Sequence, residues 1–170
     1  TTGLSEVPTK ESELLDGVAV SGEGNSTTLT FRAKEGVSLG GFVVAYDGDN
    51  TIIYVRRKLV LTEGAYPLLG MVVVVDPGHG GDDDGAAGVA RDDGPKEREI
   101  NLAAAKAVSQ YLRGLGASVL LTRTDDTRVE MEDRQEIIRH PDVDLVISLH
   151  ANSIESYLDG TGPSGTETYY

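Results

Sequence analysis

Residues 72–88 read VVVVDPGHGGDDDGAAG, a run of four valines followed by a turn that carries one histidine. A continuous apolar run ended by Pro and Gly is typical of a strand buried on both faces of a parallel sheet. We therefore predict the first strand of such a sheet at 71–76, with His79 just past its carboxyl end. Open α/β sheets bind their ligands at this edge, so the turn indicates a functional site.

Downstream of this strand, apolar strands alternate with helical segments. Apolar residues at helical spacing predict a helix over 99–116 and a shorter one over 129–140, which Pro141 ends. Further strands are expected at 117–123, 143–150 and 165–170. The alternation predicts an α/β fold with a mostly parallel, twisted sheet and flanking helices.

Upstream of residue 68, the pattern changes to short segments rich in β-branched and aromatic residues, at 17–22, 27–33, 40–46 and 51–61. DGDN at 47–50 is interpreted as a hairpin turn rather than a calcium loop, which needs a longer series of ligands. We predict a linker plus a small antiparallel β-rich module over 1–67, and one α/β domain over 68–170. No internal repeat is evident in the residue pattern.

The composition narrows the possible functions. The 170-residue chain has a net charge of −13, which disfavours nucleic acid and other polyanions as partners. It contains no cysteine, so only His, Asp and Glu remain as plausible metal ligands. No apolar run is long enough to span a membrane, and residues 1–11 lack the features of a signal peptide. Any export signal is therefore expected outside this chain.

Two of the three histidines follow predicted strands of the parallel sheet. His79 comes after the first strand and His150 closes the strand at 143–150, so they converge if these strands are neighbours. A catalytic zinc site prefers three ligands from His and carboxylates, and Glu97 or Glu99 at the helix start could supply the third. Helical geometry does not choose between them. Taken singly, each residue also has a structural explanation, as a hydrogen-bonded loop histidine or a helix-dipole glutamate.

Six motifs support a more specific interpretation. They are VVVVDPGHGGDDDGA, KEREINLA, LLTRTDD, MEDR, DLVISLHANS and GTETYY, in this order. Together they resemble the motifs of the zinc-dependent N-acetylmuramoyl-L-alanine amidases of bacterial cell-wall turnover, the amidase-3 group. The resemblance runs from about Pro67 to Tyr170. It implies a peptidoglycan hydrolase that cleaves the amide between N-acetylmuramic acid and the L-alanine of the stem peptide, using a zinc-activated water.

The resemblance also implies a ligand set for Zn²⁺. The histidines of DPGHGG and SLHAN fall on His79 and His150. The family's acidic ligand falls on Glu97 in EREINL, which leaves Glu99 as an exposed helix residue.

The resemblance places the general-base glutamate of the family on a late strand. That strand is expected C-terminal to Tyr170, because neither Glu155 nor Glu167 occupies the matching motif position. The catalytic residue is therefore unknown and is expected outside these 170 residues. We expect the chain to be a truncated catalytic domain rather than a natural fragment that binds without cutting.

Three other residues are candidates for supporting roles. Asp76 could accept a hydrogen bond from the His79 imidazole and orient it. Asn152 could bond to substrate or to a ligand, or simply form a turn. Arg134 could hold a loop or bind a stem-peptide carboxylate, although an ordinary surface or ion-pair role is the more common one for arginine.

The resemblance implies peptidoglycan as the partner and a location outside the cytoplasm, secreted, periplasmic or in the cell wall. The β-rich module resembles the end of a wall-targeting domain, and a structural spacer is the alternative. Two rival functions stay open: a zinc hydrolase of a different cell-wall substrate, and a noncatalytic cell-wall-binding fragment. A phosphate-binding loop at 78–85 is disfavoured because its aspartates would repel phosphate.

Overall fold

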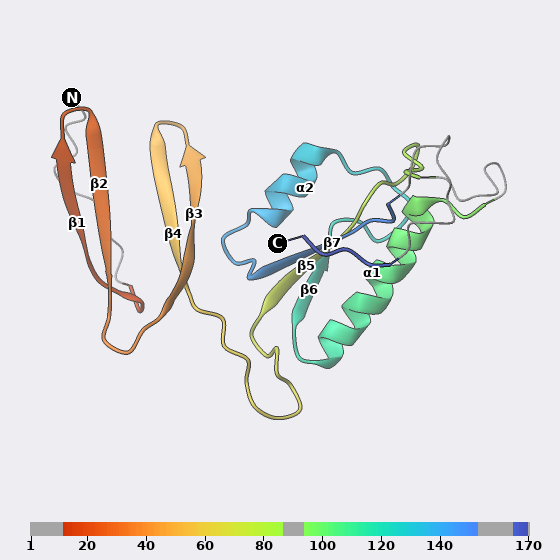
Figure 1. The fold of residues 1–170 in the computed structure, drawn as a ribbon, viewed down its shortest axis with the longest axis horizontal. Coiled ribbons are helices and arrows are strands. Elements are labelled where there is room, and N and C mark those ends of the chain that lie inside the picture. Colours follow the sequence, from red (N-terminus) through yellow and green to blue (C-terminus); the bar gives the residue numbers. More distant parts are fainter. Residues whose placement is uncertain (1–11, 87–93, 153–164, 170) are drawn as a thin grey trace. The chain divides into compact units, whose positions relative to one another are not determined.

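The computed structural model describes residues 12–86, 94–152 and 165–169. The chain divides into two compact units, Thr1–Val60 and Leu61–Tyr170, and each is described by itself (Figure 1).

The N-terminal unit consists of two antiparallel hairpins. Its strands are β1 (Leu15–Glu23), β2 (Ser26–Ala33), β3 (Leu39–Asp47) and β4 (Asn50–Arg57), with β1 paired to β2 and β3 paired to β4. Asp47 pairs with Asn50, so DGDN forms a two-residue hairpin loop in which Gly48 has a φ of 57°. The predicted antiparallel β module and its hairpin turn are confirmed. The last strand is shorter than predicted, because residues 58–61 leave the ladder and are exposed.

The two hairpins are structural copies of each other. The irregularity between Leu15 and Gly17 in β1 recurs between Leu39 and Gly41 in β3, 24 residues later. The two-residue loop after Glu23 recurs after Asp47 with the same offset of 24 residues. Our expectation that the chain has no internal repeat was therefore wrong. The residue pattern also contains the repeat, because identical residues recur at this offset, among them Gly17 and Gly41, Gly24 and Gly48, and Arg32 and Arg56.

The C-terminal unit contains a three-stranded parallel sheet in the order β6-β5-β7. Its strands are β5 (Val72–Pro77), β6 (Ser118–Leu121) and β7 (Leu145–Leu149). Central β5 pairs in parallel with both neighbours, and the side chains of Val73, Val74 and Val75 are completely buried. The predicted parallel α/β sheet is confirmed, and the valine run is its centre.

Helix α1 (Glu97–Gly114) covers one face of this sheet, and α2 (Met131–Ile138) contacts β5. Ala105 of α1 packs into the core with Val73, Val75, Ala117 and Val119. Among the described residues, no helix is long and apolar enough to cross a membrane.

A glycine ends α1 by a defined hydrogen-bond pattern. The Gly116 N–H donates to the Arg113 carbonyl, and the Ala117 N–H donates to the Leu112 carbonyl. Gly116 has a φ of 97°, which glycine adopts without the steric cost that other residues pay. This is a Schellman motif, and it turns the chain directly into β6.

The segment GTETYY differs from its prediction. Residues 165–169 form no strand, and Tyr170 lies outside the described residues. A β-rich composition does not make a strand unless a partner strand supplies the ladder hydrogen bonds.

The sheet predicts a sharp contrast between two apolar substitutions. Val75→Ala removes two methyl groups from a fully buried position and should lower the free energy of unfolding by about 2 to 3 kcal/mol. Leu120→Ala in neighbouring β6 removes a side chain that is 51% exposed and should cost less than half as much. Urea denaturation of both variants measures the difference, and equal losses would contradict the burial described here.

Candidate metal centre

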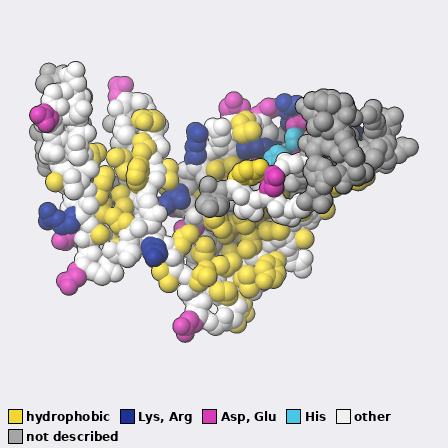
Figure 2. All heavy atoms as spheres, viewed as in Figure 1, with side chains coloured by type: hydrophobic (Ala, Val, Ile, Leu, Met, Phe, Trp, Pro, Cys, Tyr) yellow, Lys and Arg dark blue, Asp and Glu magenta, His cyan; other side chains and the backbone are white. Residues whose placement is uncertain are grey.

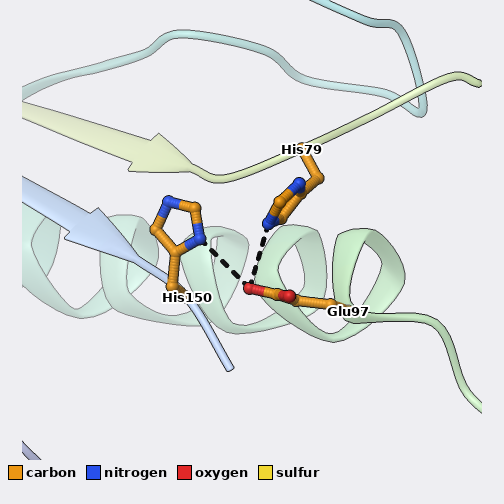
Figure 3. Close-up of side chains that lie close together, drawn as sticks. All are labelled: His79, Glu97 and His150. Atoms are coloured by element: carbon orange, nitrogen blue, oxygen red, sulfur yellow. Dashed lines mark hydrogen bonds and ion pairs between the residues drawn. The ribbon is translucent and has the colours of Figure 1, made fainter. Parts of the chain in front are cut away.

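Three segments bring His79, Glu97 and His150 together at the carboxyl edge of the sheet (Figure 3). His79 lies in the turn after β5, Glu97 is the first residue of α1, and His150 follows β7. One ligand atom from each side chain lies within 4.8 Å of the other two. The histidines converge because β5 and β7 are parallel neighbours. Of the two candidate glutamates, Glu97 is buried beside the histidines and Glu99 is exposed.

The Glu97 carboxylate lies between the two imidazoles. Its Oε1 atom is 3.2 Å from His79 Nε2 and 3.1 Å from His150 Nδ1. The imidazole rings themselves meet edge to face, with centroids 4.9 Å apart. Glu97 is 5% exposed, whereas both histidines are partly open to solvent. Figure 2 likewise shows histidine side chains at the surface of this unit, among acidic and basic groups.

Hydrogen bonds keep this buried carboxylate ionised. Burial by itself raises the pKa of Glu97, but donors from three segments outweigh it and lower the pKa overall. The Ala86 N–H donates to Oε2 over 2.7 Å, and the Ala151 N–H donates to Oε1 over 2.8 Å. Asn101, one turn along α1, donates from Nδ2 to Oε1 over 3.3 Å. Glu97 is therefore a fixed anion that links the start of α1 to two loops.

The turn that carries His79 needs glycine because the site is crowded. His79 itself has a φ of 61°, the only non-glycine residue with a positive φ among those described. A methyl group on Gly78 would lie 2.2 Å from the His150 ring. A methyl group on Gly85 would lie 2.7 Å from both Glu97 Oε2 and His79 Cδ2. The glycines of DPGHGGDDDG thus allow backbone and imidazoles to approach closely.

Two buried arginines hold this turn by its carbonyl groups. Arg123 donates from Nε to the Pro77 carbonyl over 3.0 Å, and from Nη2 to the Gly78 carbonyl over 2.9 Å. Arg134 donates from Nη1 to the Pro77 carbonyl over 2.9 Å, and from Nη2 to the His79 carbonyl over 2.7 Å. Both guanidinium groups are almost completely buried. Three consecutive carbonyls are thus bonded to cationic donors.

Asp76 is the buried anion of this cluster. It pairs with Arg134 Nη1 and accepts hydrogen bonds from Thr122 Oγ1 over 2.6 Å and from Ser148 Oγ over 2.8 Å. Burial raises the pKa of Asp76, but the hydrogen bonds from Thr122, Ser148 and Arg134 together lower it below its usual value. Asp76, in β5, therefore links the segment that follows β6 to β7 at the edge that carries the site.

The supporting roles differ from some of our expectations. Asp76 does not orient His79: its oxygens are directed to Arg134 and the neighbouring strands, and Asp83 Oδ2 lies 2.9 Å from His79 Nδ1 instead. Arg134 holds the loop through backbone carbonyls, and it also forms an ion pair with Asp76, the more common role that we named for it. Asn152 is exposed, and its Nδ2 lies 3.4 Å from Glu167 Oε2.

Comparison with known proteins identifies the family. The sequence profile of the N-acetylmuramoyl-L-alanine amidase family, amidase-3 type, matches residues 73–170. The chain belongs to this amidase family. This agrees with the resemblance that the six sequence motifs indicate.

The relatives of this amidase-family chain are longer than the shared segment. The chain is 38% identical over 104 residues to the N-acetylmuramoyl-L-alanine amidase LytC of Bacillus subtilis, covering 61% of this chain and 19% of LytC. It is 47% identical over 81 residues to AmiA of Escherichia coli, covering 48% of this chain and 27% of AmiA. The solved catalytic domain of CwlV from Bacillus (Paenibacillus) polymyxa var. colistinus matches with a TM-score of 0.47 and 39% identity, covering 51% of this chain and 48% of that one.

Residue-by-residue reasoning missed two important side chains of this family member. Arg123 ends the motif LLTR at the carboxyl end of β6, where it reaches the His79 turn. Asp83 is the middle residue of three consecutive aspartates, and nothing in the run distinguishes it from Asp82 or Asp84. Arg123 is the last residue of the strand predicted at 117–123, and this was an available signal, because strand ends meet at one edge of a parallel sheet.

The close approach of Gly78 to His150 generates one prediction. Gly78→Ala should displace the His150 ring and lower the free energy of unfolding by about 1 to 3 kcal/mol, because the new methyl group overlaps the imidazole. Gly114→Ala is the matched control, since no heavy atom lies within 4 Å of its added methyl group and alanine favours helix. NMR shifts of the His150 ring and thermal denaturation measure both effects. If the NMR shifts of the His150 ring are unchanged in Gly78→Ala, the close approach of Gly78 to His150 is refuted.

The Asp76–Arg134 pair generates a pH-dependent prediction. Asp76→Asn should lower the free energy of unfolding by about 3 to 5 kcal/mol at neutral pH, because it leaves a buried guanidinium without its anion. The folded-state pKa of Asp76 is lowered, so its contribution is present above the unfolded pKa of about 3.9 and is lost as the pH falls through the folded value. The difference in the free energy of unfolding between the parent and Asp76→Asn should therefore become smaller below about pH 4.

Denaturation curves from pH 7 down to about pH 2.5 test this expectation. Asp133→Asn is the control, because it removes the same charge next to Arg134 at an exposed position on α2. If the difference in the free energy of unfolding between the parent and Asp76→Asn stays constant with pH, the buried ionised pair is contradicted.

Proposed function

We propose that His79, Glu97 and His150 hold a zinc ion. The observation that carries this proposal is the convergence of two imidazoles and one buried carboxylate, from three separate segments, within 4.8 Å. Two histidines and one glutamate are the ligand set of several catalytic zinc sites, which leave a further position for water or substrate. The donor types and their spacing therefore fit the metal of the family.

We also propose that the protein cleaves the amide between N-acetylmuramic acid and the L-alanine of the peptidoglycan stem peptide. Family membership and the partly exposed imidazoles support this, since an extended polymer can reach the site from solvent. When bound, zinc would supply Lewis-acid polarisation of the scissile carbonyl and activation of a water. The substrate implies that the protein acts outside the cytoplasmic membrane.

The residues of this chain would supply a negative charge at the metal site and hold the His79 turn in place. Glu97 enters the reaction as a carboxylate because its hydrogen bonds lower its pKa, so it neutralises part of the metal charge. The two arginines would keep the His79 turn in place through their hydrogen bonds to its carbonyl groups. The proton-transferring glutamate stays a prediction, in the sequence after Tyr170.

Zinc titration tests the metal proposal. The parent chain should bind zinc with one ion per chain, and His79→Ala and His150→Ala should each lose at least about 100-fold in affinity, more than the loss of an outer hydrogen-bond partner causes. His140→Ala and Glu99→Gln are matched controls, since both residues are exposed and outside the cluster. Competition with a chromogenic chelator gives the affinities. A folded parent chain without zinc affinity would overturn the proposal.

Product analysis tests the reaction. Digestion of purified sacculi should release free L-alanine amino termini and leave the glycan strands intact. The assay uses both the chain alone and a form extended beyond Tyr170, because the glutamate of the family is predicted there. Zinc binding with different products would favour another cell-wall substrate, and sacculus binding without any product would favour a noncatalytic role.

A further inference from the structure

We propose that Asp83, the middle residue of the aspartate run, is a positioning residue that fixes the tautomer and ring orientation of His79. The consequence for zinc affinity rests on the proposed metal function, whereas the effect on the imidazole does not. The proposal assigns different roles to three adjacent carboxylates.

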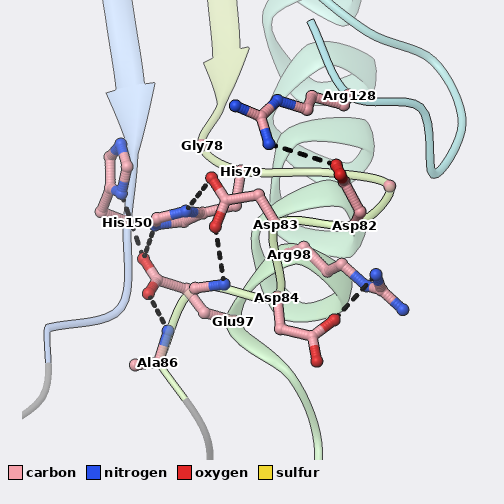
Figure 4. Close-up of polar contacts among 12 residues, drawn as sticks. Gly78, His79, Asp82, Asp83, Asp84, Ala86, Glu97, Arg98, Arg128 and His150 are labelled. Carbon is pink, nitrogen blue, oxygen red and sulfur yellow. Dashed lines mark hydrogen bonds and ion pairs between the residues drawn. The ribbon is translucent and has the colours of Figure 1, made fainter.

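The geometry around His79 gives each ring nitrogen its own partner. Nδ1 lies 2.9 Å from Asp83 Oδ2, and Nε2 lies 3.2 Å from Glu97 Oε1 (Figure 4). A neutral imidazole carries its proton on one nitrogen only, and Asp83 as a carboxylate can only accept. Glu97 beside Nε2 is also a carboxylate, but only the contact of Nδ1 with Asp83 has hydrogen-bond geometry, whereas Nε2 and Glu97 are related by an ion-pair distance alone. We therefore assign the proton to Nδ1, which leaves the Nε2 lone pair directed into the site. A metal ligand must present such a lone pair.

The loop holds the Asp83 carboxylate in a defined place. Its second oxygen, Oδ1, accepts the Gly85 N–H over 3.2 Å. The backbones of Gly80 and Asp83 exchange two hydrogen bonds of 3.1 Å, which close the turn. Both carboxylate oxygens thus have partners within the same short loop. The hydrogen bonds within the loop therefore fix the Asp83 carboxylate as an acceptor for the His79 imidazole.

The adjacent aspartates have different partners. Asp82 is 78% exposed in its side chain and lies 3.3 Å from Arg128. Asp84 binds Lys96 Nζ over 2.7 Å and Arg98 Nη1 over 2.8 Å, near the start of α1. Neither contacts an imidazole in the part of the chain that the structure describes (Figure 4). Asp82 therefore offers a control with the same charge, one residue away and without the bond to His79.

A purely structural role for Asp83 makes a different prediction from a positioning role. If Asp83 only closed the loop through Gly85, its removal would disturb the loop amides and leave the protonation of His79 unchanged. If it positions His79, the proton distribution between Nδ1 and Nε2 changes even where the loop is retained. The tautomer is thus the measurement that separates the two roles.

The test compares Asp83→Ala, Asp83→Asn and Asp82→Asn with the parent chain, all free of metal and in the same mildly alkaline buffer. Two-bond ¹H–¹⁵N NMR spectra report the tautomer of His79. The parent and Asp82→Asn should show the Nδ1–H form, and Asp83→Ala should populate the Nε2–H form. Asp83→Asn should retain most of the Nδ1–H form, because its amide oxygen can still accept.

Zinc affinity is the second measurement on the same proteins. Asp83→Ala should lose about 10- to 100-fold, the usual effect of removing the hydrogen-bond partner of a ligating histidine, and Asp82→Asn should stay within about twofold. An Nδ1–H form that persists in Asp83→Ala would overturn the proposal, whatever the affinity. If the parent binds no zinc, the proposed metal function fails, and the tautomer measurement still decides the role of Asp83.

Discussion

The bonds from two buried guanidinium groups to three consecutive carbonyls are the interaction on which the site depends. Arg123 lies just after β6 and donates to the carbonyls of Pro77 and Gly78. Arg134 lies in α2 and donates to the carbonyl of His79. Burying two cations side by side is unfavourable, and burial together with the Arg134 charge lowers the pKa of Arg123. Asp76 offsets part of this cost as a buried anion paired with Arg134. Lysine could not replace either residue, because its single ammonium group lacks the planar fork that spans adjacent carbonyls.

These bonds explain how His79 keeps a backbone conformation that non-glycine residues avoid. A φ of 61° costs free energy for a residue with a side chain, and such a conformation persists only where the surroundings determine it. Here the Arg134 bond holds the His79 carbonyl, and Gly78 and Gly80 on either side remove further steric conflict. The strained residue is also the one whose imidazole faces Glu97. The strain therefore coincides with the placement of a ligand side chain.

Much of the fold could be predicted because it follows from local patterns. The valine run indicated a buried strand, and the order of strands and helices indicated a parallel sheet, which in turn brought the ends of β5 and β7 to one edge. Glu97 and Glu99 could not be separated by periodicity, because both lie in the first turn of α1. The choice depends on which face of the helix meets the sheet.

One error concerned contacts between segments distant in sequence. Asp76 follows the strand pattern, yet its carboxylate is directed to Thr122 and Ser148 on the neighbouring strands. A strand residue and the histidine three positions later need not face each other. The hairpin repeat was missed for a different reason. The pairing of β1 with β2 has the same register as the pairing of β3 with β4, but the identical residues, such as Gly24 and Gly48, are separated by positions that differ.

Glu97 connects the parts of the site into one preformed unit. Its carboxylate accepts N–H groups from Ala86 in the loop before α1 and from Ala151 after β7, while it also meets both imidazoles. A movement of either loop would therefore break a charge-assisted hydrogen bond in a buried place, where an unpaired group is costly. Because three segments share one carboxylate, the ligand side chains can be held close together by the protein alone. Such preorganisation lowers the entropic cost of binding, because the ligand side chains are already ordered before a ligand arrives.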